Sequence, residues 1–238
     1  MKKFWNFKKV TNSEAEERVL ELNGTIAEES WFDDEITPRM FKEELLSGSG
    51  PLTVWINSPG GDCIAASQIY SMLIDYKDDV TVKVDGIAAS AASVIAMAGT
   101  KVLLAPTALM MIHNPAMGVF GDHNDMDKAK AVLEEVKESI INAYAIKTGK
   151  SRALLSKLME SETWMNANKA IELGFANGIL ERESNEVVPS DAYMFGAKEF
   201  DMALVNKISD KSKDEPTSKK GRNVSELKDK LVTIKKFI

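Results

Sequence analysis

Two short stretches of this sequence carry residues suited to acyl-transfer chemistry. Ser90 lies in the small-residue run Gly86–Ser93, directly after the alternating run Val80–Val84. His113, one of only two histidines in the chain, follows the strand-like run Ala108–Ile112. A hydroxyl becomes a useful nucleophile when a neighbouring imidazole takes its proton. The pair therefore predicts a serine hydrolase in which two adjacent strands bring Ser90 and His113 to one edge of a sheet.

Acyl transfer also needs a carboxylate that orients the base and donors that stabilise the oxyanion. Five acidic residues are candidates for the carboxylate: Asp122, Asp125, Asp127, Glu160 and Glu162. For the donors, the turn that contains Gly60 and Gly61 stands between a predicted strand and a predicted helix, so its backbone N–H groups can approach a ligand. The N–H of Ala91, directly after the serine, is the other predicted donor.

Secondary-structure elements must bring these residues together, and predicted strands alternate with predicted helices along the chain. We predict strands at 18–26, 52–56, 80–84, 101–104 and 109–112. We predict helices at 37–46, 63–76, 90–97, 125–147, 151–159 and 166–174. This order favours an α/β fold with parallel strand pairs.

Length and composition fit a cytoplasmic enzyme. The 238 residues suffice for one domain, or for one domain with an appendage. The single cysteine, Cys63, excludes an internal disulfide framework and favours a reducing compartment, and we interpret it as a small buried residue. The sequence shows neither an apolar leader nor a run of about 18 apolar residues, so we expect no signal peptide and no membrane span.

The net charge of −6 is unevenly distributed. Residues 206–238 hold ten Lys/Arg and five Asp/Glu, whereas the rest of the chain has an acidic excess that argues against nucleic-acid binding. We expect an N-terminal segment at 1–17, a catalytic domain at 18–200, a disordered linker at 206–222 and an amphipathic basic helix at 223–238. This last helix is either a solvated appendage or a docking element for a partner such as a capsid protein.

Four motifs resemble the proteolytic subunit of the Clp protease (the ClpP-like serine peptidases) in the order and spacing of that family. The motifs are Ile56–Gly61, Gly86–Ser90, Met111–Pro115 and Ala170–Gly174. The resemblance covers residues 19–180 and implies an α/β fold, the crotonase-like ββα superhelix, with a handle helix over 125–147. Residues 31–34 and 163–165 look like the branch carried by phages and prophages, whose members are associated with capsid maturation.

The resemblance also implies the roles of the triad residues. Ser90 would be the nucleophile and His113 the general base. Glu162 takes the place of the family's aspartate, two positions before an aromatic residue that is Trp164 here. Glutamate is a departure that moves the carboxylate, although triads with Glu exist. Ser161 stands where the family has a basic residue linked to ring–ring contacts, so that contact is not expected here.

The same resemblance places oxyanion donors at Gly61 and Ala91 and substrate-pairing residues at Gly118, Val119 and Phe120. It implies a polypeptide substrate that is cut inside a chamber of heptameric rings, stacked face to face into a homo-oligomeric tetradecamer. It implies no cofactor. An ATP-driven unfoldase of the AAA+ class and a capsid protein both remain open as the partner that supplies substrate.

Three rival functions remain open alongside the serine endopeptidase. They are a catalytically silent ring subunit, a crotonase-type enzyme acting on a coenzyme A thioester, and a serine peptidase with a lysine base. The presence of a nucleophile, a base and a candidate acid argues against the silent subunit. The acidic run 122–127 lacks the glycine and terminal glutamate of a calcium loop, so we interpret it as the start of a helix and predict no metal ion.

Overall fold

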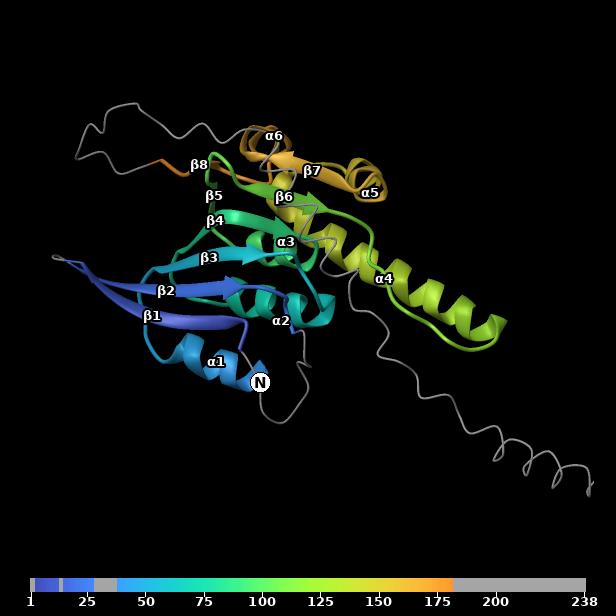
Figure 1. The fold of residues 1–238 in the computed structure, drawn as a ribbon, viewed down its shortest axis with the longest axis horizontal. Coiled ribbons are helices and arrows are strands. Elements are labelled where there is room, and N and C mark those ends of the chain that lie inside the picture. Colours follow the sequence, from blue (N-terminus) through green and yellow to red (C-terminus); the bar gives the residue numbers. More distant parts are fainter. Residues whose placement is uncertain (1–2, 13–14, 28–37, 182–238) are drawn as a thin grey trace, which may run out of the picture. The chain divides into compact units, whose positions relative to one another are not determined.

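A computed structural model of the chain describes residues 3–12, 15–27 and 38–181 (Figure 1). Several predictions lie outside these residues. They concern the tail segments 206–222 and 223–238, the C-terminal part of the expected 18–200 domain, and the phage-type segment 31–34. The candidate site residues all fall within the described part.

Eight strands of the described chain form one sheet (Figure 1). They are β1 Trp5–Asn12, β2 Ala15–Asn23, β3 Leu52–Ser58, β4 Val80–Ala89, β5 Lys101–Leu104, β6 Leu109–Ile112, β7 Thr163–Asn166 and β8 Gly178–Ile179. The main path runs β1–β2–β3–β4–β5–β8, and its strands are parallel from β2 onward. The predicted α/β fold with parallel strand pairs is confirmed.

Strand β4 positions the site because it pairs with two different strands along its length. Its first part, Thr81–Val84, pairs with β5, and its second part, Ile87–Ala89, pairs with β6. We predicted that this strand would end at Val84, and it continues to Ala89. The absence of a side chain at Gly86 allows this continuation, because a Cβ there would lie only 2.6 Å from Asn57 Oδ1 of β3.

The first strand of the sheet, β1, has no counterpart in the sequence prediction, which began with a strand at 18–26. The structure pairs β1 antiparallel with β2, with Trp5 opposite Leu22. Aromatic packing explains the extra strand, because the Trp5 ring lies 4.9 Å from the Phe4 ring and 5.5 Å from the Phe41 ring between centroids. Burying such large rings is a strong driving force for folding.

Six helices are described, and each coincides with a predicted one to within a few residues. They are α1 Pro38–Leu46, α2 Cys63–Ile74, α3 Ala91–Ala96, α4 His123–Thr148, α5 Arg152–Glu160 and α6 Ala167–Leu173. The predicted helices 151–159 and 166–174 begin at cap residues, because the side chains of Ser151 and Asn166 accept backbone N–H bonds at the starts of α5 and α6. None of the described helices is long and apolar enough to cross a membrane.

Arg18 ties β2 to the ends of α1 and α2 although it is almost wholly buried. Its guanidinium donates to the carbonyl oxygens of Leu45 and Gly48, each at 2.9 Å, and to the hydroxyl of Tyr76 at 2.6 Å. The Tyr76 hydroxyl in turn donates to Gly50 O at 2.8 Å. Buried charges are tolerated when their hydrogen bonds are made, so this network stabilises the fold away from the candidate site.

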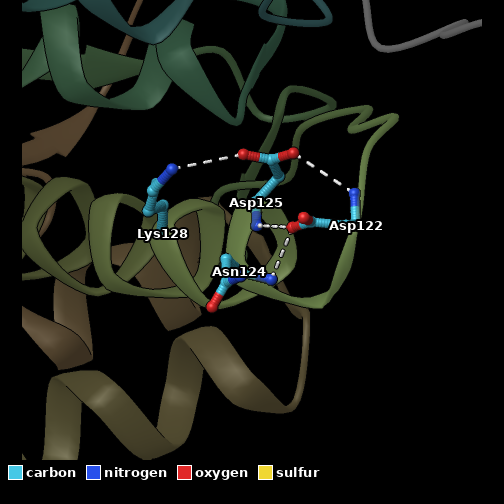
Figure 2. Close-up of polar contacts among 4 residues, drawn as sticks. All are labelled: Asp122, Asn124, Asp125 and Lys128. Carbon is cyan, nitrogen blue, oxygen red and sulfur yellow. Dashed lines mark hydrogen bonds and ion pairs between the residues drawn. The ribbon is translucent and has the colours of Figure 1, made fainter.

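The longest helix, α4, projects beyond the sheet and begins at the acidic run (Figure 1). Figure 2 shows its capping box: the Asp122 carboxylate accepts from the N–H groups of Asn124 and Asp125, and the Asp125 carboxylate accepts from the N–H of Asp122. Lys128 forms an ion pair with Asp125. The interpretation of this run as a helix start is confirmed. Within the described residues, no group of three or more His, Cys, Asp or Glu is placed to hold a metal ion.

Candidate active site

Ser90 occupies the sharp turn between β4 and α3. Its φ of 53° and ψ of −125° lie outside the regions that L-residues usually adopt. Its N–H donates to Met111 O at 2.9 Å, which ties the turn to β6. Its hydroxyl makes no helix-capping bond, although Ser90 stands at the N-cap position. The hydroxyl is therefore available for chemistry, and a strained backbone held by its surroundings is typical of functional sites.

His113 meets Ser90 directly. The two residues follow neighbouring parallel strands in which Ala89 pairs with Met111. His113 Nε2 lies 2.7 Å from Ser90 Oγ, which is hydrogen-bonding distance. The sequence prediction that adjacent strands bring this serine and this histidine together is confirmed, and their contact has the geometry of a nucleophile with its general base.

Glu162 lies next to the base in register but makes no hydrogen bond with it. Strands β6 and β7 are antiparallel, and their last pair is Ile112 with Thr163, so the next position sets His113 opposite Glu162. Glu162 is exposed and has a φ of 45°. The Glu162 carboxylate accepts a hydrogen bond from Trp164 Nε1 at 3.1 Å. Within the described residues, this carboxylate makes no hydrogen bond with His113.

The other candidate carboxylates are less suited to orient the base. Glu160 accepts from Lys137 at 3.0 Å and from Ser156 at 3.1 Å, and the Lys137 hydrogen bond lowers the pKa of the Glu160 carboxyl. Asp122 and Asp125 cap α4 (Figure 2), and Asp127 is an exposed residue of the same helix. Of the five carboxylates, Glu162 is the one that the β6–β7 register sets beside the histidine.

Two glycines between β3 and α2 hold a backbone turn against the serine. A Cβ on Gly60, whose φ is 99°, would lie 2.7 Å from Ser90 Cβ. A Cβ on Gly61, whose φ is 149°, would lie 2.2 Å from Ile26 O. Side chains are therefore excluded at both positions, by close contact and by backbone conformation.

The predicted oxyanion donors differ in their availability. The N–H of Gly60 donates to Ser58 Oγ at 3.1 Å and is thus already engaged. Among the residues that the structure describes, no group accepts a hydrogen bond from the N–H of Gly61 or from the N–H of Ala91. Two free N–H groups that flank the nucleophile are the arrangement that an oxyanion hole requires.

The predicted substrate-pairing residues follow His113 in the segment 114–121, which belongs to no strand of the sheet. Gly118 is exposed, with open space where a side chain would be, and Val119 is half-buried. Phe120 is fully exposed. A backbone outside the sheet keeps its hydrogen-bonding groups available to a substrate strand.

The lone cysteine, Cys63, lies two residues after Gly61, at the first position of α2. Cys63 is partly buried, and burial raises the pKa of its thiol. A protonated thiol is a poor nucleophile, so this position does not compete with Ser90 for that role.

Sequence reasoning missed three side chains that are hydrogen-bonded to the candidate site residues, two of them directly and one through a neighbour. In the sequence analysis, Trp164 only helped to match Glu162 with the position of the family's aspartate. In the structure, its indole N–H donates a hydrogen bond to the Glu162 carboxylate. Ser93 and Tyr144 were not singled out, yet they form a buried chain of hydrogen bonds to the carbonyl of Ser90. Tyr144 lies within the predicted helix 125–147, and no local pattern reveals that its hydroxyl reaches α3.

Comparisons with known proteins agree with the motifs. Residues 4–183 match the model of the Clp protease family. The ATP-dependent Clp protease proteolytic subunit 1 of Chlamydia muridarum is 33% identical over 150 residues, which cover 61% of this chain and 78% of that protein. The subunit 1 of Rhodococcus jostii is 31% identical over 169 residues, covering 70% and 76%. The proteolytic subunit of Porphyromonas gingivalis is 31% identical over 156 residues, covering 63% and 70%.

Proposed function

The chain belongs to the Clp protease family, a family of serine peptidases, and we propose that it cuts peptide bonds with a triad of Ser90, His113 and Glu162. The observation that carries this proposal is the 2.7 Å contact between Ser90 Oγ and His113 Nε2. Support for Glu162 comes from its register position beside the histidine.

The proposed reaction has two steps. Ser90 Oγ attacks the carbonyl carbon of the peptide bond while His113 Nε2 takes its proton, and the same proton then passes to the departing amine. This leaves an acyl-enzyme ester. Water attacks the ester with His113 again as base, which releases the acid product and returns the proton to Ser90 Oγ. The carboxylate of Glu162, turned towards Nδ1, would stabilise the imidazolium that forms in both steps.

The negative oxygen of each tetrahedral intermediate needs hydrogen-bond donors. The N–H groups of Gly61 and Ala91 are the proposed donors, since no acceptor inside the described residues occupies them. Each such donor contributes about 2.7–4 kcal/mol to transition-state stabilisation. The segment with Gly118, Val119 and Phe120 would pair with the substrate backbone.

Assembly into homo-oligomeric rings, heptameric and stacked in pairs, is the proposed working state. The relatives are named proteolytic subunits of an ATP-dependent protease, which supports an ATP-driven unfoldase as the partner that feeds the chamber. The single cysteine is consistent with the reducing cytoplasm as the proposed location. Sedimentation of the purified chain tests the assembly, and a monomer under all conditions would contradict it.

Processing of phage capsid or scaffold proteins is a second candidate function. The phage-type residues 163–165 and the basic excess of residues 206–238 favour it, because a charged tail can tether the enzyme to a partner. Deletion of 206–238 should then abolish binding to the capsid protein while leaving hydrolysis of a short peptide intact. Unchanged binding after the deletion would overturn this role for the tail.

Peptide hydrolysis by variants tests the proposed triad. With a fluorogenic peptide amide, we expect Ser90→Ala and His113→Ala to lower kcat by at least about 10⁴-fold, as in other serine triads. Cys63→Ser is the control and should retain activity. Full activity of His113→Ala would indicate a lysine base instead. Hydrolysis of a coenzyme A thioester without peptide cleavage would favour the crotonase-type function, and an inactive assembled wild type would favour a silent subunit.

A further inference from the structure

A buried chain of hydrogen bonds reaches the backbone of the nucleophile from helix α4. Ser93 Oγ donates to Ser90 O at 2.6 Å, and Ser93 N–H donates to the same oxygen at 2.9 Å. Ser93 Oγ also lies 2.7 Å from the hydroxyl oxygen of Tyr144. Both side chains are almost fully buried.

Counting protons shows which group donates in each hydrogen bond of this series. A serine hydroxyl has one proton, and a carbonyl oxygen can only accept. The proton of Ser93 Oγ is therefore used in the bond to Ser90 O, so Tyr144 must donate its own proton to Ser93 Oγ. Burial raises the pKa of Tyr144, which keeps the phenol protonated and able to donate at neutral pH. The bonds thus run from Tyr144 to Ser93 and from Ser93 to the Ser90 carbonyl.

The residues at both ends of this series of hydrogen bonds, Tyr144 and Ser90, are held by their neighbours. Tyr144 lies on α4, and its ring packs edge-on against Phe175 with 5.3 Å between centroids. Ser93 lies in α3, one turn after the nucleophile. Ser90 itself has a φ of 53°, a conformation that persists only when neighbouring groups hold it.

The Ser90 carbonyl belongs to the same planar peptide unit as the N–H of Ala91. In a trans peptide these two groups point in opposite directions, so holding the carbonyl also sets the direction of the N–H. We infer that Tyr144 and Ser93 are positioning residues for the oxyanion hole, because together they hold the 90–91 peptide with its N–H aimed at the developing oxyanion. This inference rests on the proposed function, which makes Ala91 N–H an oxyanion donor.

The test removes one hydroxyl at a time. Tyr144→Phe keeps the ring but loses the donor, and Ser93→Ala loses both side-chain bonds while the Ser93 N–H still holds Ser90 O. With a fluorogenic peptide, we expect kcat to fall about 3- to 10-fold in Tyr144→Phe and about 10- to 50-fold in Ser93→Ala, since small displacements of catalytic groups are costly. KM should not change, because an oxyanion donor acts in the transition state.

A matched control separates positioning from stability. Tyr76→Phe also removes a hydrogen-bonded, part-buried tyrosine hydroxyl, but its partners are Arg18 and Gly50. We expect this variant to lose thermal stability while keeping its kcat. The pH at which kcat/KM rises should be the same in Tyr144→Phe and wild type, because the change does not touch His113. Adding Tyr144→Phe to Ser93→Ala should have no further effect on kcat, because the chain is already broken.

The outcomes distinguish this inference from the function on which it rests. Equal kcat values for Tyr144→Phe and Tyr76→Phe, with wild type active through Ser90, would overturn the positioning role and leave the proposed function intact. A Tyr144→Phe variant that raises KM at constant kcat would overturn it as well. A wild type whose turnover does not depend on Ser90 overturns the proposed function itself. Because Tyr144→Phe keeps the packed ring, it tests the inference even if Ser93→Ala does not fold.

Discussion

Ser90 and Glu162 both have positive φ values, yet they are held in opposite ways. Ser90 is half-buried where β4, β6 and α3 meet, and its N–H and carbonyl are both hydrogen-bonded to buried neighbours. Glu162 stands on the surface, where its carboxylate binds the half-exposed Trp164. The serine is already hydrogen-bonded to His113, whereas the carboxylate is hydrogen-bonded to Trp164 instead.

This difference separates a preformed part of the candidate triad from an adjustable part. The contact between nucleophile and base follows from strand register and core packing, so it is present without substrate. A hydrogen bond between base and acid requires another conformation of the exposed Glu162 side chain. Fixing the three rotatable bonds of that side chain costs conformational entropy. Variants of the preformed part should therefore lower activity more than variants of the adjustable part, and the predictions below test that order.

Apart from the removal of Ser90 or His113 themselves, the largest effect is expected from Gly60→Ala. A methyl group there would lie 2.7 Å from both Ala89 O and Ser90 Cβ, at a backbone φ of 99°. Steady-state hydrolysis should show kcat/KM at least about 100-fold lower, because the nucleophile is displaced. Unfolding in urea should show a loss of more than about 1 kcal/mol.

Gly178→Ala in β8 is the control for that substitution. Its new methyl group would meet only a leucine side-chain atom, Leu103 Cδ2, at 3.4 Å. This variant should keep wild-type kcat/KM. Near-normal activity of Gly60→Ala would show that the part around the serine is not preformed in the way described.

A smaller effect is expected from Glu162→Gln. The substitution keeps shape but removes the charge that stabilises the imidazolium. Since the carboxylate is exposed and adjustable, we expect kcat to fall about 10- to 100-fold, short of the about 10⁴-fold seen when a buried triad aspartate is neutralised. Glu160→Gln serves as the control because Glu160 is bound to Lys137 and Ser156. If Glu160→Gln reduced kcat more than Glu162→Gln, the acid would be misassigned.

Trp164→Phe should reduce activity less again. It keeps an aromatic ring opposite Met111 but removes the indole N–H that holds the Glu162 carboxylate. An exposed hydrogen bond to a charged group contributes about 1.5 kcal/mol or less, so kcat should fall by no more than about 10-fold. The same substitution in a Glu162→Gln background should have a smaller effect. Equal effects in both backgrounds would mean that Trp164 does not act through Glu162.

The smallest expected effect is on the free energy of unfolding. It comes from the ion pair between Lys137 and Glu160, two residues before Glu162. The hydrogen bond from Lys137 lowers the pKa of Glu160 below its ordinary value of 4.5. Stability from this pair is therefore present above that value and is lost as the pH falls through the lowered folded-state pKa. Urea unfolding at pH 6 and near pH 3 should show a weaker pH dependence in Lys137→Met than in wild type. An identical dependence in both proteins would contradict the account of this pair.

Much of the fold and the preformed part of the site could be predicted from sequence because their signals are local. Short continuous apolar runs marked β5 and β6, and the predicted helices 151–159 and 166–174 begin at Ser151 and Asn166, the residues that cap α5 and α6. Ser90 could be placed at a strand-to-helix turn because small residues follow a clear strand pattern. Parallel strands then bring the residues at their ends together.

The parts that escaped prediction depend on distant contacts. Strand β1 exists because Trp5 packs against Phe41, a residue far along the chain. Strand β7 has the mixed sequence Thr-Trp-Met-Asn, without the continuous apolar run that marks β6, and its pairing with β6 sets the position of Glu162. The bond between Tyr144 and Ser93 joins residues 51 positions apart. Local sequence patterns carry no information on such pairs.

The most direct test of the central claim is the site of reaction with a fluorophosphonate probe. Peptide mapping by mass spectrometry should locate the adduct on Ser90 in the wild-type protein. The labelling rate should fall by at least about 10³-fold in His113→Ala, because the hydroxyl loses the base that activates it. An adduct on another serine, or rapid labelling of Ser90 in His113→Ala, would contradict the claim that this preformed pair is the catalytic centre.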